Sequence, residues 1–274
     1  MRQCLIFVCL IIISYQQNQD FPLIVAANRD EFYARPTAAL DWWANSPQIL
    51  GGADISQSIR GAWLGTNRHG RFAAITNFRD PGKDRKDAAS RGLTVRRYLE
   101  GGVSTADFVL ELVETASQYN GFNLLFGTKD ELWYYGNRSG EPPTQVSPGL
   151  HVLSNALLDT PWPKTLHAAE KFQALRENPP DAQSVFDLLA DRTQAGKSEV
   201  QRTGLPLKYE IALSSIFIAQ KFRRRWFFRS VGYGTRASSY LTFSRAGEIT
   251  FHERTWINGK PAGDRDFRFM SEAD

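Results

Sequence analysis

Residues 7–36 read FVCLIIISYQQNQDFPLIVAANRDEFYARP, and two apolar runs in this stretch begin the fold. The runs at 5–14 and 22–27 are short, aliphatic and separated by a polar segment, which predicts two buried strands. The second run changes abruptly to an amide, a guanidinium and two carboxylates, in the order Asn28, Arg29, Asp30, Glu31. We expect the strand to end there and to direct these groups into a pocket.

The composition is that of a globular protein. The chain has 274 residues, of which 42% are hydrophobic and 23% charged, and this predicts one substantial core. The 33 Lys and Arg against 29 Asp and Glu give a mixed surface, unlike the basic footprint of a nucleic-acid-binding protein. Cys4 and Cys9 have neither the number of a disulfide framework nor the spacing of a zinc site. We therefore expect a cytoplasmic protein that binds no nucleic acid.

The apolar run at 4–13 is too short to span a bilayer, so no transmembrane segment is predicted. Behind Arg2 it could imitate the core of a signal peptide. The small-residue cleavage pattern is missing, however, because SYQQ follows at 14–17. A buried first strand is the preferred interpretation.

Further strands are predicted wherever aliphatic and aromatic runs lie between Gly, Pro, Asn or Asp, at 71–77, 122–127, 131–136, 150–155, 213–218, 238–244 and 248–253. Helical spacing predicts a helix over 106–117, Asp181 can cap a second helix, and Pro163 can open a third that continues to Leu175. Strand groups interrupted by helices indicate a layered α+β domain with antiparallel-rich sheets.

Residues 221–229, KFRRRWFFR, interleave basic and aromatic side chains. A membrane surface or an anionic ligand could use the arginine charges and the apolar area of the rings. Because the run is short, a solvated loop or hairpin whose aromatic rings pack inward is preferred.

Familiar catalytic motifs are missing from the sequence, which has no phosphate-binding glycine loop, no His-Glu-x-x-His and no Gly-x-Ser-x-Gly elbow. The histidines lack metal spacing, so no metal site is predicted; they are His69, His151, His167 and His252. The remaining candidates are Cys9 and polar residues near strand ends, namely Asn28, Arg29, Asp30, Glu31, Asn77, Asn155 and Arg236.

Each candidate also has a purely structural alternative. The cluster at 28–31 could be an ion-paired strand end that only stabilises the sheet. Cys9 could be a core cysteine, Asn77 and Asn155 could be turn residues, and Arg236 could cap a loop.

Several segments resemble, in order, the NRDE family, also called the transport-and-Golgi-organisation family. They are CLI (9–11), AANRDEFYARP (26–36), GAWLGTNRHGRFAAITNFRDP (61–81), YNGFNLLFG (119–127), ELWYYGNRSG (131–140), LSNALLDTPWPK (153–164) and YGTRASSYLTF (233–243). The joint match is specific and runs from about position 8 to near the C-terminus. It implies the four-layer αββα sandwich of the N-terminal-nucleophile hydrolases.

One feature departs from the family pattern, in which the cysteine follows the initiator Met. Here 19 positions separate Cys9 from Asn28, as in the family, whereas 24 separate Cys4 from Asn28. We therefore expect residues 1–8 to be a misassigned or removed extension, and 9–274 to form a single domain.

Position 8 itself is compatible with this interpretation, because a valine codon can serve as a bacterial start that is read as Met. The competing interpretation takes Cys4 as the family start and lengthens the loop before Phe21.

An N-terminal cysteine joins a nucleophile and a base in one residue. Its α-amine has a reference pKa of about 7.7–8.0, so near neutral pH a useful fraction can take the thiol proton. In the catalytic set that the resemblance implies, Arg29 or Arg236 favours the thiolate and Asp30 orients the amine. Asn77 and Asn155 would donate to an oxyanion that develops on the attacked carbonyl.

The resemblance implies functions of different classes. The first is a cysteine amidohydrolase without a cofactor, acting on a small acyl amide, with Asn28, Glu31 and Trp63 contacting the ligand. The second is heme binding or trafficking in the same pocket without turnover, in which cationic and aromatic residues hold the propionates and the porphyrin face. No axial-ligand motif is evident for heme. The third is an inactive scaffold of the hydrolase fold.

Overall fold

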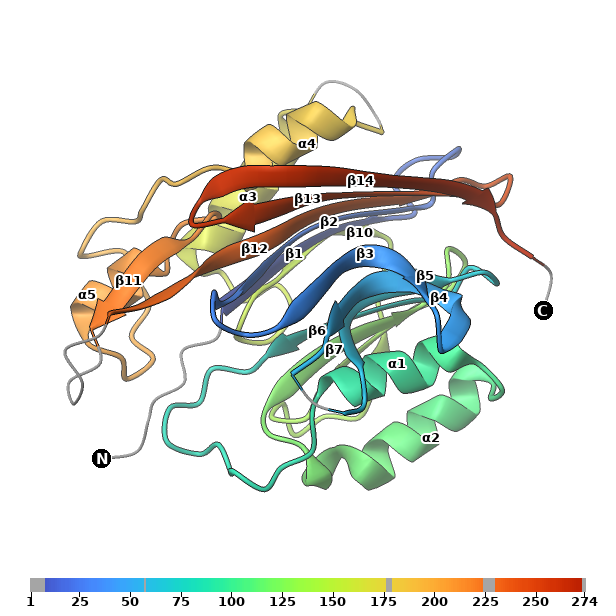
Figure 1. Ribbon diagram of the computed structural model, residues 1–274, viewed down its shortest axis with the longest axis horizontal. Coiled ribbons are helices and arrows are strands. Elements are labelled where there is room, and N and C mark those ends of the chain that lie inside the picture. Colours follow the sequence, from blue (N-terminus) through green and yellow to red (C-terminus); the bar gives the residue numbers. More distant parts are fainter. Residues whose placement is uncertain (1–7, 57, 176–178, 224–229, 273–274) are drawn as a thin grey trace.

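Two antiparallel sheets lie face to face at the centre of the computed structural model, which describes residues 8–56, 58–175, 179–223 and 230–272 (Figure 1). The first sheet has the order β10-β1-β2-β12-β13-β14, and β11 also pairs with β12. Its strands are β1 (Val8–Tyr15), β2 (Leu23–Phe32), β10 (Gly149–Leu153), β11 (Ala219–Arg223), β12 (Ser230–Phe243), β13 (Glu248–Ile257) and β14 (Lys260–Met270).

The second sheet follows the chain order from β3 to β9. Its strands are β3 (Thr37–Trp43), β4 (Ser46–Asp54), β5 (Gly61–Asn67), β6 (Phe72–Asn77), β7 (Phe122–Gly127), β8 (Leu132–Gly136) and β9 (Thr144–Gln145). The short connection from β2 to β3, residues 33–36, carries the chain from the first sheet to the second, so β1 and β2 remain beside the C-terminal strands.

Helices cover the outer faces of both sheets (Figure 1). The second sheet is covered by α1 (Gly92–Glu100) and α2 (Thr105–Thr115), which is followed by a single 3₁₀ turn, η1 (Ala116–Gln118). The first is covered by α3 (Pro163–Gln173) and α4 (Ala182–Leu189), with a short α5 (Leu207–Ala212) nearby. The order of layers is helix, sheet, sheet, helix, so the predicted four-layer αββα sandwich is confirmed.

Alternation along β1 explains its unbroken apolar sequence. Ile11 and Ile13 face the second sheet in the central core, whereas Leu10 and Ile12 face α3 and α4. A strand buried on both faces needs apolar side chains at every position. Phe72 of β6 meets Phe243 of β12 edge to face with centroids 6.3 Å apart, which ties the two sheets together.

The predicted helices are confirmed. The Asp181 side chain accepts a hydrogen bond from the Ser184 backbone N–H at 3.0 Å and caps α4, and Pro163 occupies the first turn of α3. The predicted strand at 213–218 is wrong. This apolar run turns through the core after α5, where Phe217 N–H donates to Asp191 O at 2.7 Å, and only its last residue, Ile218, accepts a backbone bond from β12, from Thr235 N–H at 2.8 Å.

Several elements were not predicted at all. They are β3, β4, β5 and β14, the short strands β9 and β11, and the helices α1 and α5. Their sequences mix glycine and polar residues with apolar ones, which hides the period. Of the basic-aromatic run, residues 224–229 lie outside the described residues, so its predicted contacts are untested. Within the described part of the chain, every helix is too short or too polar to cross a membrane.

Candidate active site

The polar cluster lies inside a strand. Our expectation that the strand would end at residue 27 is wrong, because β2 continues to Phe32. The backbone of β2 is paired on both sides, by β1 and by β12, which carries the strand through the polar residues. All four cluster side chains are buried, with exposed fractions of 0%, 8%, 2% and 7% for Asn28, Arg29, Asp30 and Glu31. Each therefore needs a partner or a function.

Strand alternation divides the cluster between two faces of the sheet. Cys9 is paired in register with Arg29, and both line the space between the sheets together with Glu31. Asn28 belongs to the opposite face, where its Nδ2 donates to Leu189 O at 2.8 Å and Ile216 O at 3.0 Å. These bonds connect β2 to the C-terminal end of α4 and to the turn that contains Ile216. Asn28 is not among the residues that line the cavity.

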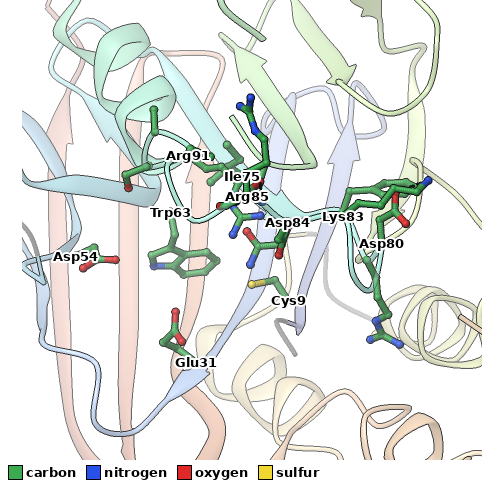
Figure 2. Close-up of a pocket in the computed structure, with 18 of the residues that line it drawn as sticks. Cys9, Glu31, Asp54, Trp63, Ile75, Asp80, Lys83, Asp84, Arg85 and Arg91 are labelled. Atoms are coloured by element: carbon green, nitrogen blue, oxygen red, sulfur yellow. Dashed lines mark hydrogen bonds and ion pairs between the residues drawn. The ribbon is translucent and has the colours of Figure 1, made fainter. Parts of the chain in front are cut away.

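Cys9 opens onto a cavity of about 1430 Å³ between the ends of the two sheets. Figure 2 shows its side chain between Trp63 and Glu31 on one side and the segment that carries Asp80 and Lys83 on the other. The lining also includes Asn77, as well as Arg29 and Asp30. Of the predicted ligand contacts, Glu31 and Trp63 are therefore on the cavity wall, and their binding roles stay predictions.

The segment between β6 and α1, residues 78–91, forms one wall of this cavity. Its charged side chains have both signs, and they are Arg79, Asp80, Lys83, Asp84, Arg85, Lys86, Asp87 and Arg91. Sequence reasoning missed this wall, because a polar segment between a strand and a helix looks like any solvated loop. Such a lining suits a ligand that carries polar or charged groups.

The backbone of Cys9 is held by the turn that follows β10. Its N–H donates to Asn155 Oδ1 at 3.2 Å, and its carbonyl accepts from Ser154 Oγ at 2.8 Å. Asn155 Nδ2 in turn donates to the carbonyl of Asn77 at 2.8 Å. Asn155 therefore lies at the nitrogen of Cys9, which favours a role in holding that nitrogen over the predicted oxyanion role.

The thiol of Cys9 is strongly shifted towards its neutral form. Burial is the main cause, and the nearby Asp30 carboxylate adds to it, so that the pKa rises to about 12. A thiol of this kind is a poor nucleophile at neutral pH unless a base takes its proton directly.

In the chain that retains Val8, we expect the rate of Cys9 alkylation by iodoacetamide to rise about tenfold per pH unit from pH 7 to 10, because the thiolate fraction rises by that factor below the pKa. Peptide mass spectrometry measures the adduct on Cys9 apart from Cys4. The urea-unfolded chain is the control and should level off near pH 9, since an ordinary cysteine has a pKa of about 8.5. A plateau below pH 9 in the folded chain would contradict the shift.

Buried acids around Cys9 have cationic neighbours. Glu31 lies 3.9 Å from Arg29 and 3.6 Å from Arg35, and Glu210 lies 3.1 Å from Arg79. These pairs offset part of the cost of burying each carboxylate.

Asp30 is held differently. Its Oδ1 accepts from Thr235 Oγ1 at 2.6 Å, while its Oδ2 is buried and has no hydrogen-bond partner among the described residues. Burial raises the pKa of Asp30 to about 7, against the opposing charge of Lys164. Sequence reasoning gave no role to Lys164, which ends the LSNALLDTPWPK segment and is 1% exposed in α3.

Arg236 occupies a bulge in β12, where the register shifts between Thr235 and Ala237. Its guanidinium donates to the carbonyls of the turn after β2 and to one hydroxyl there; the acceptors are Phe32 O, Tyr33 O, Arg35 O and Thr37 Oγ1, at 3.1–3.2 Å. It is not part of the cavity lining described above. The bonds favour a structural role, and the predicted catalytic role stays a prediction.

Glu253 lies between the sheets, where it was not expected. Its Oε1 accepts from the Leu40 backbone N–H at 2.7 Å, and burial raises its pKa from 4.5 to about 7. The folded chain therefore holds this proton more tightly than the unfolded chain, and stability falls as the pH rises from about 4.5 to about 7.

We expect Glu253→Gln to remove this pH dependence and to raise the free energy of unfolding at pH 8 by about 2 kcal/mol, since glutamine keeps the acceptor without the buried charge. Urea unfolding at pH 5, 6, 7 and 8 measures the effect. Glu248→Gln, on the exposed side of the same strand, is the control and should leave the profile in place. An equal loss of stability at every pH in Glu253→Gln would contradict the assignment.

The order of layers and a cysteine at the start of a central strand, opening between the sheets, define an αββα sandwich of the N-terminal-nucleophile hydrolase type. The chain belongs to the Transport and Golgi organisation 2 family, whose model matches residues 8–258. It is 34% identical over 255 residues to the Transport and Golgi organization protein 2 homolog of Bos taurus, covering 88% of this chain and 89% of that protein.

Other relatives span the same region. The Homo sapiens homolog is 34% identical, covering 87% of this chain and 88% of that protein, and the Drosophila melanogaster protein is 25% identical with 95% of both covered. Among solved structures, a variant of conjugated bile acid hydrolase from Clostridium perfringens aligns with a TM-score of 0.46 at 11% identity, covering 97% of this chain and 98% of that one.

Proposed function

We propose that the chain, when Cys9 is its first residue, is a cysteine amidohydrolase that cleaves the C–N bond of a small acyl amide. One observation carries the proposal: the nitrogen of Cys9 is held by Asn155 while the Cys9 side chain lines a large cavity. A free amine at that nitrogen would keep the same acceptor and would lie on the same residue as the thiol.

The reaction begins with transfer of the thiol proton to the α-amine of Cys9. The thiolate attacks the amide carbonyl, and the C–N bond breaks as the leaving amine takes the proton from the α-ammonium. The product is a thioester on Cys9. Water, deprotonated by the same amine, then attacks the thioester and releases the carboxylic acid and the thiol.

Neighbouring groups support this sequence. Arg29 lies across the strand pair from Cys9 and favours the thiolate by its charge. Asn77 is on the cavity wall beside Cys9 and is the candidate donor to the oxyanion. Trp63 and Glu31, which lie on one side of the thiol in Figure 2, are candidate contacts to the substrate.

The proposal requires that Val8 be absent from the active chain, because an amide nitrogen cannot act as the base. In the described chain Val8 is buried and its N–H donates to Tyr233 Oη at 2.6 Å. Without Val8, the hydroxyl of Tyr233 would face the amine. Cys4, the competing candidate, lies outside the described residues.

Intact mass of the protein, expressed from its native gene with its native upstream region, tests the first requirement. A mass that begins at Cys9 is expected. The purified chain is then incubated with a panel of acyl amides, and the released amine is measured. A mass that retains residues 1–8, or no turnover of any amide by a chain shown to begin at Cys9, would count against the hydrolase.

Heme binding without turnover is the alternative function. It is favoured by the presence of cationic residues together with Trp63 and Phe78 in the cavity lining, which suits propionates and a flat ring. Titration with hemin, followed by absorbance, distinguishes the two functions. Binding that persists in Cys9→Ala, together with no amide turnover in the parent chain, would support the carrier.

A further inference from the structure

A lysine buried beneath the nucleophile has no role in the reaction described above. Lys164 lies in the first turn of α3, on the helix side of the first sheet, and its side chain is 1% exposed. Within the described ranges, its Nζ is buried without a hydrogen-bond partner. A buried ammonium is costly, and burial lowers its pKa to about 8.

Asp30 shares this side of the sheet. Val8 and Asp30 are opposite each other in the β1–β2 pair, so the Asp30 side chain leaves β2 on the face that α3 and α4 cover, at the end of the sheet where Asp30 also borders the cavity. Its Oδ2 is likewise buried without a hydrogen-bond partner among the described residues. The two groups are close enough for the charge of each to shift the pKa of the other.

The other buried carboxylates near this site already have cationic partners, so Lys164 is the cation that remains for Asp30. Glu31 has Arg29 and Arg35, and Glu210 has Arg79. The titratable and charged groups around Lys164 and the Cys9 nitrogen are Cys9, Arg29, Asp30, Glu31, Arg79, Glu210 and Tyr233.

We infer that Lys164 is the counter-ion of Asp30, and that it thereby leaves the α-amine of Cys9 neutral and able to act as the base. This inference rests on the proposed function, because it concerns the chain that begins at Cys9. Lys164 is a positioning residue that acts through Asp30, and it does not contact the substrate.

Charge balance supplies the reason. A buried carboxylate requires a cation nearby. If Lys164 provides this cation, the three groups together carry no net charge when Asp30 is a carboxylate, Lys164 is an ammonium and the α-amine of Cys9 is uncharged. If Lys164 is removed, Asp30 and the α-amine of Cys9 together carry one negative charge. They become neutral only when one of them binds a proton. The base is then occupied, and higher pH is needed to free it.

The experiment measures the amine directly, without a substrate. Formaldehyde reacts with an N-terminal cysteine when the neutral amine adds to the carbonyl and the thiol closes a thiazolidine ring, with loss of one water. Intact mass gives the rate of adduct formation, and the midpoint of its pH profile reports the amine. The variants are Lys164→Met, Lys164→Arg and Asp30→Asn, in the chain whose mass begins at Cys9.

We expect Lys164→Met to move the midpoint up by about one pH unit or more, the range that a neighbouring charge produces. Lys164→Arg should stay within a few tenths of a unit of the parent, because it keeps the charge. Asp30→Asn should move the midpoint down, since it removes the anion and leaves the cation, and it provides the test if Lys164→Met does not fold.

An unchanged midpoint in Lys164→Met or in Asp30→Asn would overturn the inference and leave the proposed function intact. Failure of the parent chain to form any thiazolidine would instead contradict the free amine, and both proposals would fall. The two failures are therefore distinguishable.

Discussion

Amide hydrolysis by the natively expressed protein should fall by a factor on the order of 10⁴ or more in Cys9→Ala, because the variant lacks the atom that forms the acyl intermediate. Released amine, measured at fixed protein concentration, gives the rate. The fold should survive, since Cys9 is 7% exposed in a strand whose pairing uses only backbone groups, and alanine removes a single sulfur atom.

Cys4→Ala is the matched control, because Cys4 is the alternative start of the family pattern. If Cys9 is the nucleophile, Cys4→Ala keeps the parent rate. Loss of activity in Cys4→Ala with full activity in Cys9→Ala would transfer the assignment to Cys4. Cys9→Ser tests the thiol itself, and it should also lose most of the activity, since a hydroxyl is far harder to deprotonate.

The largest loss of stability is expected at Glu210. Its side chain is fully buried and accepts from Arg79 Nη1 at 3.1 Å, from Gln201 Nε2 at 3.3 Å, and from the backbone N–H and hydroxyl of Thr203 at 2.7 Å each. Glu210→Gln leaves the Arg79 charge buried beside an amide. We expect the free energy of unfolding, measured in urea, to fall by about 3–5 kcal/mol.

Two comparisons make this expectation specific. The double variant Glu210→Gln with Arg79→Met removes both charges and should recover part of the loss, because no uncompensated charge remains. Glu248→Gln breaks an ion pair whose Arg268 side chain is 73% exposed, and it should cost about 1 kcal/mol or less. Equal losses in Glu210→Gln and Glu248→Gln would contradict the importance of burial.

Local sequence patterns predicted the parts of the fold that local forces determine. Three features could be predicted because each depends on neighbouring residues. They are the apolar strand around Ile11 to Ile13, the Asp181 cap and the helix start at Pro163. The run at 213–218 has the composition of a strand, but only its last residue, Ile218, forms a backbone hydrogen bond with a strand, β12. Its backbone bonds to Asn28 and Asp191 in space, which a linear pattern cannot reveal.

The candidate site was predictable to a similar extent. Cys9, Arg29 and Asp30 were singled out as a cysteine and polar residues near strand ends, and the family resemblance then implied their roles. The structure brings them together at the start of β1 and near the end of β2. Lys164 could not be assigned from its type alone, because lysine is usually exposed and only the fold places it under Asp30. The sequence offered one indication of a role for Lys164, which is its position at the end of the LSNALLDTPWPK segment shared with the family.

The bulge at Arg236 bears on how this chain can change by insertion and deletion. Thr235 is opposite Asp30 and Ala237 is opposite Arg29, which are consecutive in β2. Loss of any one of residues 235, 236 and 237 would therefore leave a regular ladder, but only loss of Arg236 keeps Thr235 opposite Asp30 and Ala237 opposite Arg29. A deletion of Arg236 alone would remove its contacts to the turn after β2 and would leave Thr235 opposite Asp30.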